Sequence, residues 1–335
     1  MSTTYQKPFL CFVEQLQLLK ARGLRVSDET SAIDYLRRIG YYRLSAYWYP
    51  FRETSLQQDS VSKKLIVRRN DQFIEGARFQ DALDLYVFDK RLRLLLLDAI
   101  ERIEIAVRVD IAHLLGEYDA FAHTNPVLLH GNFTKKIKLK TGRTGYSDWI
   151  KNYNDLVARS KEDFVKHYYC KYGGPLPIWI AVELWDFGLL SNFYQGMAIG
   201  DKEQIAAKYG LHSWKTMASW LRTINHVRNI AAHHSRLWNK NLVDQPKMPE
   251  PGEITTFDRL VGNNEIASRV YGVLCILAHL MQKICPNSSW RSRLKEMVKN
   301  FPHIPNVSAK DMGCPSDWID HAFWSDKSVA VLRSK

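Results

Sequence analysis

An arginine, an asparagine and a histidine in the second half of the chain have side chains suited to phosphodiester chemistry. Arg228, Asn229 and His233 lie in the segment Trp220–Lys240, which reads WLRTINHVRNIAAHHSRLWNK. Histidine titrates near neutral pH and can exchange protons. Arginine keeps its positive charge and can stabilise charge that develops on a phosphate, and an asparagine amide can orient a phosphate oxygen. These residue types are typical of acid–base cleavage of RNA.

The spacing of apolar residues predicts that this whole segment is one helix. The predicted apolar face consists of Trp220, Ile224, Val227, Ala231 and Trp238. The predicted polar stripe on the opposite face consists of Arg222, His226, Asn229, His233, Arg236 and Lys240. At about 100° per residue, His234 falls on the apolar face and His233 on the stripe. We therefore expect His234 to be a packed core histidine and His233 to be available for chemistry.

Other interpretations of the stripe stay open at this point. A solvated polar face is the most common explanation, and a zinc site through His226 and His233 lacks cysteine or carboxylate partners. We therefore expect no metal and no cofactor. The spacing R-x4-H is weak evidence, since Arg108 and His113 repeat it. In a straight helix Arg228 lies about 140° around the axis from His233, so a distorted helix, a swung arginine or a second copy of the chain must bring the two together.

Polar residues elsewhere are candidates to support the site. Glu104 and Arg108 are four residues apart on a predicted helix, where they form either a structural ion pair or a support for the site. Glu183 could orient the histidine or the arginine, and otherwise makes a structural contact. His226 is a further supporting candidate because it lies on the predicted stripe.

The net charge of +12 favours a polyanionic partner such as nucleic acid. The segment 130–146 concentrates lysines, which alternate with apolar residues before two glycines, so it is either a phosphate-contacting turn or a solvated loop. The residues that we predict to contact RNA are Lys135, Lys136, Lys138, Lys140, Arg143, Arg222 and Arg236.

Helical periodicity dominates the rest of the chain and predicts a mainly α fold. A long core helix is expected at 81–115, and residues 54–79 form either a hairpin arm or an ordered loop. The aromatic cluster at 41–51 either packs in the core, which we favour, or stacks on RNA bases. Further helices are predicted at 9–22, 27–40 (with Ser27 as the cap), 177–197, 202–209, 213–238, 264–285 and 288–300.

Cysteine usage and hydropathy predict a cytoplasmic protein. The five cysteines are scattered and include no C-x-x-C pair, which disfavours a disulfide framework or a zinc site of that kind. No signal peptide is recognisable, and the apolar run Leu94–Leu97 is too short to cross a bilayer.

Several segments together resemble the Abi-like (AbiD/AbiF) family of abortive infection proteins. The run from Arg228 to His233 has the R-N-x-x-x-H form of the HEPN ribonuclease motif. The segments that carry the wider resemblance are KPFLCFVEQLQLLKARGL, YLRRIGYYRLSAYWYPFR, AIERIEIAVR, LPIWIAVELWDFGLLSNFY, RNIAAHHSRLWN and MGCPSDW.

The resemblance implies an HEPN-like helical bundle with an N-terminal helical extension and a small basic hairpin or loop insertion. The implied divisions are 1–80 for the extension, 81–301 for the core and 302–335 for an irregular tail. It also implies a phage-defence endoribonuclease that works as a homodimer and needs no metal. By motif match, His233 is the acid–base, Arg228 the charge stabiliser and Asn229 the positioning residue.

In the implied reaction, the RNA 2′-hydroxyl attacks the adjacent phosphate and leaves a 2′,3′-cyclic phosphate. Such a toxin must be restrained, and the resemblance implies that a small structured RNA, or another antitoxin-like partner, provides the restraint. Two alternatives stay open. One is a non-catalytic RNA-binding regulator on the same fold, and the other is a dimerising module whose polar stripe is only an interface.

Overall fold

The computed structural model describes residues 6, 8–58 and 65–324 of the 335. The chain divides into two compact units, of which the first comprises Met1–Leu92 with Asn300–Asp311, and the second Arg93–Lys299 with Met312–Lys335. Helices dominate both units, so the predicted mainly α class is confirmed. The predicted division at residues 80 and 302 stays a prediction.

Three short helices and a hairpin precede the long helix in the first unit. The elements are α1 (Phe12–Ala21), α2 (Glu29–Ile39), α3 (Tyr41–Trp48), β1 (Arg52–Gln58), β2 (Leu65–Phe73) and the first turns of α4 (Phe79–Gly116). The cap of α2 is Asp28, whose Oδ1 accepts a hydrogen bond from the Ser31 amide at 3.0 Å, and not Ser27 as predicted. Gly40 ends α2 with a φ of 91°, a conformation that glycine adopts without strain.

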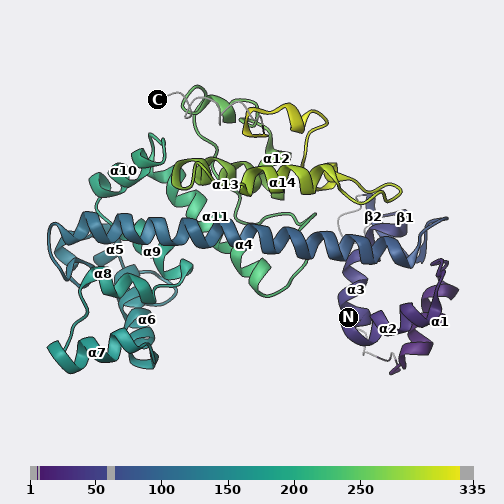
Figure 1. Ribbon diagram of the computed structural model, residues 1–335, viewed down its shortest axis with the longest axis horizontal. Helices are drawn as coiled ribbons and strands as arrows, with labels where there is room; N and C mark the ends of the chain where they lie inside the picture. Colours follow the sequence, from purple (N-terminus) through teal and green to yellow (C-terminus); the bar gives the residue numbers. More distant parts are fainter. Residues whose placement is uncertain (1–5, 7, 59–64, 325–335) are drawn as a thin grey trace. The chain divides into compact units, whose positions relative to one another are not determined.

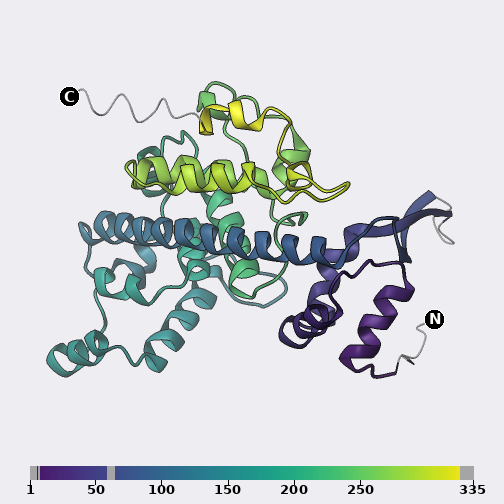
Figure 2. The same cartoon turned by 45° about the vertical axis from the view of Figure 1, so that its right-hand side comes forward.

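The segment after the aromatic cluster forms the predicted hairpin arm. Strands β1 and β2 pair antiparallel, and residues 59–64 between them, with Lys63 and Lys64, lie outside the described residues (Figure 2). Tyr47, Trp48 and Phe51 are buried, so the core of the aromatic cluster packs inside this unit. The Tyr47 hydroxyl donates to Asp89 at 2.7 Å, which satisfies both polar groups in the core.

Helix α4 is one uninterrupted helix, as predicted, and its residues from Arg93 onward belong to the second unit (Figures 1 and 2). The other helices of this unit are α5 (Gly131–Thr134), α6 (Gly145–Arg159), α7 (Asp163–Tyr172), α8 (Ile178–Ala181), α9 (Phe187–Gly196), α10 (Ile199–Lys208), α11 (Trp214–Ala232), α12 (Asn264–Ser268), α13 (Val270–Ile284) and α14 (Trp290–Lys299). Every residue from Val270 to Met281 of α13 is buried, which places this helix at the centre of the core. Helix α14 lies along α4, where the Trp290 indole donates to the Leu95 carbonyl at 2.6 Å.

Two predicted helices are interrupted. The segment predicted as 177–197 breaks after α8, because Asp186 adopts an extended conformation and caps α9 through the Leu189 amide at 2.7 Å. The segment predicted as 264–285 breaks at the extended Arg269, whose guanidinium donates to the Asn239 carbonyl at 2.9 Å. The Asp186 side chain caps the next helix, whereas the Arg269 side chain bonds to a carbonyl outside its helix. Each bond stabilises an extended residue against local helical propensity.

Three helices of the second unit, α5, α6 and α7, had no counterpart among the predicted helices. Of all the described helices, none combines the length and apolar character needed to cross a bilayer.

Candidate functional site

Helix α11 carries the R-N-x-x-x-H segment and packs as its pattern predicts. Ser213 caps the helix by accepting a hydrogen bond from the Lys215 amide at 3.3 Å. The residues Trp220, Ile224, Val227 and Ala231 of the predicted apolar face are all buried. This face fixes the rotation of α11 in the core, and therefore which side chains of the helix reach the surface.

Helix α11 ends at Ala232, six residues before the predicted end. The Ser235 amide donates to the Ile230 carbonyl at 3.0 Å and the His234 amide to the Ala231 carbonyl at 3.1 Å, which is the hydrogen-bond pattern of a Schellman motif. His234 is the left-handed residue of this motif, with a φ of 57°. His234 is also exposed, so the prediction of a packed core histidine is wrong.

Tertiary contacts explain why the chain turns at this point. The buried Arg93 of α4 donates to the Ser235 carbonyl at 3.4 Å, and Leu237 and Trp238 are fully buried just beyond the turn. Burial of two large apolar side chains contributes several kcal/mol, on the order of 2–3 kcal/mol each, which exceeds the cost of a non-glycine left-handed residue. Consequently Arg236 and Lys240 lie beyond the helix, and the predicted six-residue stripe is wrong in its last two members.

His233 is exposed at the carboxyl end of α11, where it is the C-cap residue. Its backbone amide still donates to the Asn229 carbonyl at 3.0 Å, as in a regular helix. The angle of about 140° between Arg228 and His233 therefore persists to the end of the helix. Helix α11 is therefore not distorted between Arg228 and His233 in a way that would bring their side chains together.

The Arg228 guanidinium lies beside a polar cluster that is shared with α4. It donates to the Asn229 side-chain oxygen at 3.4 Å, and its positive charge acts on the Glu104 carboxylate. Glu104 in turn accepts a hydrogen bond from Arg108, which also donates to the Trp185 carbonyl. The predicted pair of Glu104 and Arg108 therefore exists, and it lies next to Arg228.

Burial dominates the electrostatics of this cluster. The side chains of Glu104 and Arg108 are each only 15% exposed. Burial raises the pKa of Glu104 above its ordinary value, while the charges of Arg108 and then Arg228 oppose this shift and the carboxylate of Asp186 reinforces it. The charges of two arginines and of a second carboxylate thus all act on Glu104.

Two residues of this cluster were absent from the predicted site. Asp186, the cap of α9, contributes negative charge at Glu104. Asn225, one turn before Arg228, lies against the start of α9, so that a side chain added at Gly188 would meet its amide nitrogen at 3.6 Å and Asp186 at 3.2 Å. An aspartate directly before the apolar run FGLL is a recognisable helix cap, but only tertiary structure brings it to α11.

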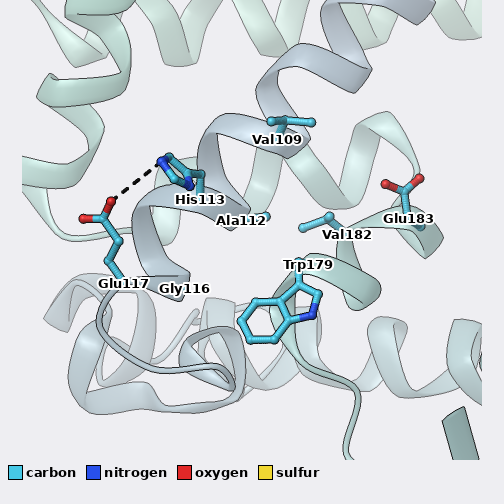
Figure 3. A pocket seen from close by; sticks show the side chains of 8 residues that line it. All are labelled: Val109, Ala112, His113, Gly116, Glu117, Trp179, Val182 and Glu183. Carbon is cyan, nitrogen blue, oxygen red and sulfur yellow. Dashed lines mark ion pairs between the residues drawn. The ribbon is translucent and has the colours of Figure 1, made fainter.

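Three other candidates lie elsewhere or in less defined surroundings. Glu183 is exposed and lines a shallow pocket around Trp179 (Figure 3). The same pocket contains His113, which is 76% exposed and lies 3.7 Å from Glu117. His226 is half-buried, and its Nε2 atom has no hydrogen-bond partner among the described residues. A supporting role for Glu183 or His226 stays a prediction.

The lysine-rich segment is exposed, as an RNA-contacting turn requires. A single bridge between Ile137 and Thr144 closes the turn in place of a regular strand pair. Lys138 and Arg143 share the carboxylate of Asp148, at 2.9 and 3.3 Å. Three of the side chains predicted to contact RNA make no ion pair among the described residues. They are Lys135, Lys136 and Lys140. On α11, Arg222 lies 3.6 Å from Asp244 and is exposed.

The fold and the cluster define a mainly helical protein with paired arginines and carboxylates at the surface end of a core helix. The family model described as Abi-like protein matches residues 34–239, which is more than half of the chain, and the chain therefore belongs to the Abi-like family. The matched region contains α4, α9 and α11 and thus every element of the cluster. No curated protein and no solved structure matches the chain.

Proposed function

We propose that this chain is a phage-defence protein with a metal-independent endoribonuclease site at the carboxyl end of α11. Membership in the Abi-like family indicates abortive infection as the biological setting. The observation that carries the enzymatic part is the placement of Arg228. The charge of its guanidinium acts on the half-buried Glu104 carboxylate, while the exposed His233 lies five residues further on.

The proposed reaction is attack of an RNA 2′-hydroxyl on the adjacent phosphate. His233 exchanges the protons, first with the 2′-hydroxyl and then with the leaving 5′-oxygen. Arg228 stabilises the negative charge that develops on the phosphate, and Asn229 holds either the arginine or a phosphate oxygen. Glu104 and Arg108 act as positioning residues that restrict the guanidinium of Arg228.

A homodimer completes this site in the proposal. Because Arg228 and His233 lie on different sides of α11, a single chain presents only half of the required constellation to one phosphate. In a two-fold dimer the same surface faces itself, so Arg228 of one copy meets His233 of the partner subunit. The exposed lysines of residues 135–140 and Arg143, together with Arg222 and Arg236, would hold the RNA backbone.

Restraint by a bound structured RNA suits the same surface. The chain carries 47 basic and 35 acidic residues, and an RNA that occupies the basic turn also competes with substrate. Removal of the bound RNA is therefore the expected trigger, and the assay must begin with protein that has been freed of nucleic acid.

A second candidate function is a non-catalytic RNA-binding regulator. The angle between Arg228 and His233 favours it, because both side chains can contact phosphate without sharing one. The product ends separate the two functions. We would incubate RNA-free protein with end-labelled RNA in excess EDTA, beside a folded His233→Ala variant.

If the chain is a nuclease, the parent should produce 2′,3′-cyclic phosphate ends and the His233→Ala variant should produce none. If both proteins bind RNA in a salt-sensitive way and neither cleaves it, the result supports the RNA-binding regulator and contradicts the nuclease. Cleavage that EDTA abolishes would contradict the metal-independent mechanism.

A further inference from the structure

The junction of α13 and α14 forms a cavity that is separate from the end of α11. It has a volume of about 740 Å³ and is bounded by the last turns of α13, the first turns of α14 and the segment at 254–256. All of its described lining residues belong to the second unit. None of them belongs to the arginine–carboxylate cluster, so this cavity is available for a different ligand.

Positive charge surrounds this cavity. Lys283, Arg291 and Lys295 line it, and no aspartate or glutamate is among the described residues that do so. Lys283 lies against Gly210, where an added side chain would meet its ammonium nitrogen at 3.6 Å. The ammonium of Lys295 donates to the Trp324 carbonyl at 2.7 Å, which fixes its position at the wall. Such a lining favours an anionic ligand.

Hydroxyl groups are interleaved with these cations. Ser288, Ser289 and Ser292 line the cavity at the start of α14. The Ser288 hydroxyl accepts from the Trp290 amide at 3.2 Å and from the Arg102 guanidinium at 3.5 Å, and Ser292 donates to the Ser289 carbonyl at 2.9 Å. Cations and hydroxyls in one place can satisfy the several acceptor oxygens of a terminal phosphate, whereas a carboxylate offers fewer.

The cavity has room and apolar surface for more than a phosphate. Its volume lies in the range of about 300–1,000 Å³ that is usual for small-molecule sites. Met281, Ile254 and Trp324 add apolar side chains to the lining. The His279 ring, which also lines the cavity, lies 2.7 Å from the Tyr209 carbonyl and is buried by the core. A lining that combines apolar side chains with cations fits a base joined to a phosphate.

We propose that this cavity binds the terminal phosphate and the base of a nucleotide. The same chemistry has two sources, a free nucleotide and the 5′-phosphorylated end of an RNA. In either case Lys283 and Arg291 contact the phosphate, the hydroxyls of Ser288 and Ser289 donate to its oxygens, and the base lies toward Met281 and Ile254.

The test is calorimetric titration of the full-length, RNA-free protein. The probes are adenosine 5′-monophosphate, adenosine, and a five-nucleotide 2′-O-methyl RNA, which lacks the hydroxyl needed for cleavage, with either a 5′-phosphate or a 5′-hydroxyl. We expect each phosphorylated probe that binds to do so at least tenfold more tightly than its unphosphorylated counterpart. Preference for the mononucleotide identifies a free nucleotide as the source, and preference for the phosphorylated RNA identifies an RNA end.

Variants locate the binding in this cavity. A Lys283→Gln, Arg291→Gln double variant should weaken the phosphorylated probe at least tenfold. Lys299→Gln is the matched control, because it removes one cation from the other end of α14, and it should leave affinity within about twofold. The proposal is overturned if neither phosphorylated probe binds at millimolar concentration, if the 5′-phosphate adds no affinity, or if the folded double variant binds as the parent does. This test is independent of RNA cleavage.

Discussion

The two copies of the R-x4-H spacing differ in where the structure places them. Arg108 and His113 lie within the uninterrupted helix α4, with the arginine held by Glu104 and the Trp185 carbonyl and the histidine beside a shallow pocket. Arg228 and His233 lie at the end of α11, where the chain turns directly after the histidine. The same spacing thus gives a structural arginine in one region, and in the other a half-buried arginine followed by an exposed histidine at the end of a helix.

Glu104 connects the two copies, because the charges of both arginines act on its carboxylate. A residue pattern alone does not reveal this connection. The surroundings of each arginine, rather than the R-x4-H spacing, therefore distinguish a supporting ion pair from a candidate site.

Truncation of Arg108 should mainly lower stability, whereas truncation of Arg228 should mainly lower RNA cleavage. Arg108→Ala leaves the buried Glu104 and the Trp185 carbonyl without their main partner, and should lower the free energy of unfolding by about 3–5 kcal/mol. Arg228→Ala should cost about 1 kcal/mol or less of stability but lower RNA cleavage on the order of 100-fold or more. Urea unfolding and a cleavage assay on both variants measure these effects, and equal stability losses would break the comparison.

A buried histidine must be separated from the exposed ones before any pH profile is interpreted. His123 is fully buried among Trp149, Tyr153 and Trp185, with no hydrogen-bond partner for either ring nitrogen among the described residues. Burial lowers the pKa of His123 to about 4. The folded protein therefore binds this proton less readily than the unfolded chain, so the associated stability is complete above pH of about 6.5 and is lost as the pH falls toward 4.

His123→Phe should remove this acid sensitivity. The expected gain at pH 4 is about 3 kcal/mol relative to the change at pH 7, by the conversion of one pKa unit to about 1.4 kcal/mol. Thermal unfolding of parent and variant across this range measures it. A variant whose acid unfolding matches that of the parent would show that other groups are responsible.

Mixing two inactive variants tests whether Arg228 and His233 act within one chain or across a dimer. If Arg228 of one copy acts with His233 of the partner subunit, Arg228→Ala and His233→Ala variants complement one another in mixed dimers. Equal mixing after dissociation should then restore about a quarter of parental activity, since half of the dimers are mixed and each retains one intact site. A mixture that stays inactive would argue for a site within one chain or for a site that needs both copies of each residue.

The smallest expected effect concerns the shared carboxylate. Because the pKa of Glu104 is raised, the folded protein retains this proton at a higher pH than the unfolded chain. The contribution of Glu104 to stability should therefore decline slightly as the pH rises above the ordinary glutamate value. Because His123 makes the protein as a whole more stable over the same range, Glu104→Gln should make the rise of the urea midpoint between pH 4 and 7 slightly larger than in the parent. A smaller rise in the variant would mean that the arginines dominate the carboxylate.

The fold was predictable where apolar periodicity decided the outcome. The long helix α4 and the buried face of α11 follow directly from the spacing of leucine, isoleucine and valine. The breaks at Asp186 and Arg269, and the early end of α11, were not predictable in this way. Each depends on a partner that is distant in sequence, such as the bond from Arg93 to the Ser235 carbonyl.

The candidate site was predictable to a similar degree. The pattern identified Arg228, Asn229 and His233 and suggested Glu104 and Arg108, which the structure brings beside Arg228. It placed His234 in the core because helical projection assumes that the helix continues, and no glycine marks the turn. Asp186 and Asn225 escaped because neither belongs to the R-x4-H pattern.

Cleavage rates of three proteins test the central claim most directly. Parent, His233→Ala and His113→Ala, each freed of RNA and shown to be folded, would be compared on one labelled RNA in EDTA. The account predicts that His233→Ala loses activity on the order of 100-fold or more, while His113→Ala, which removes an exposed histidine at the same spacing from an arginine, stays within about twofold of the parent. Equal activity of His233→Ala and the parent, or a greater loss in His113→Ala, would contradict the assignment of the site to the end of α11.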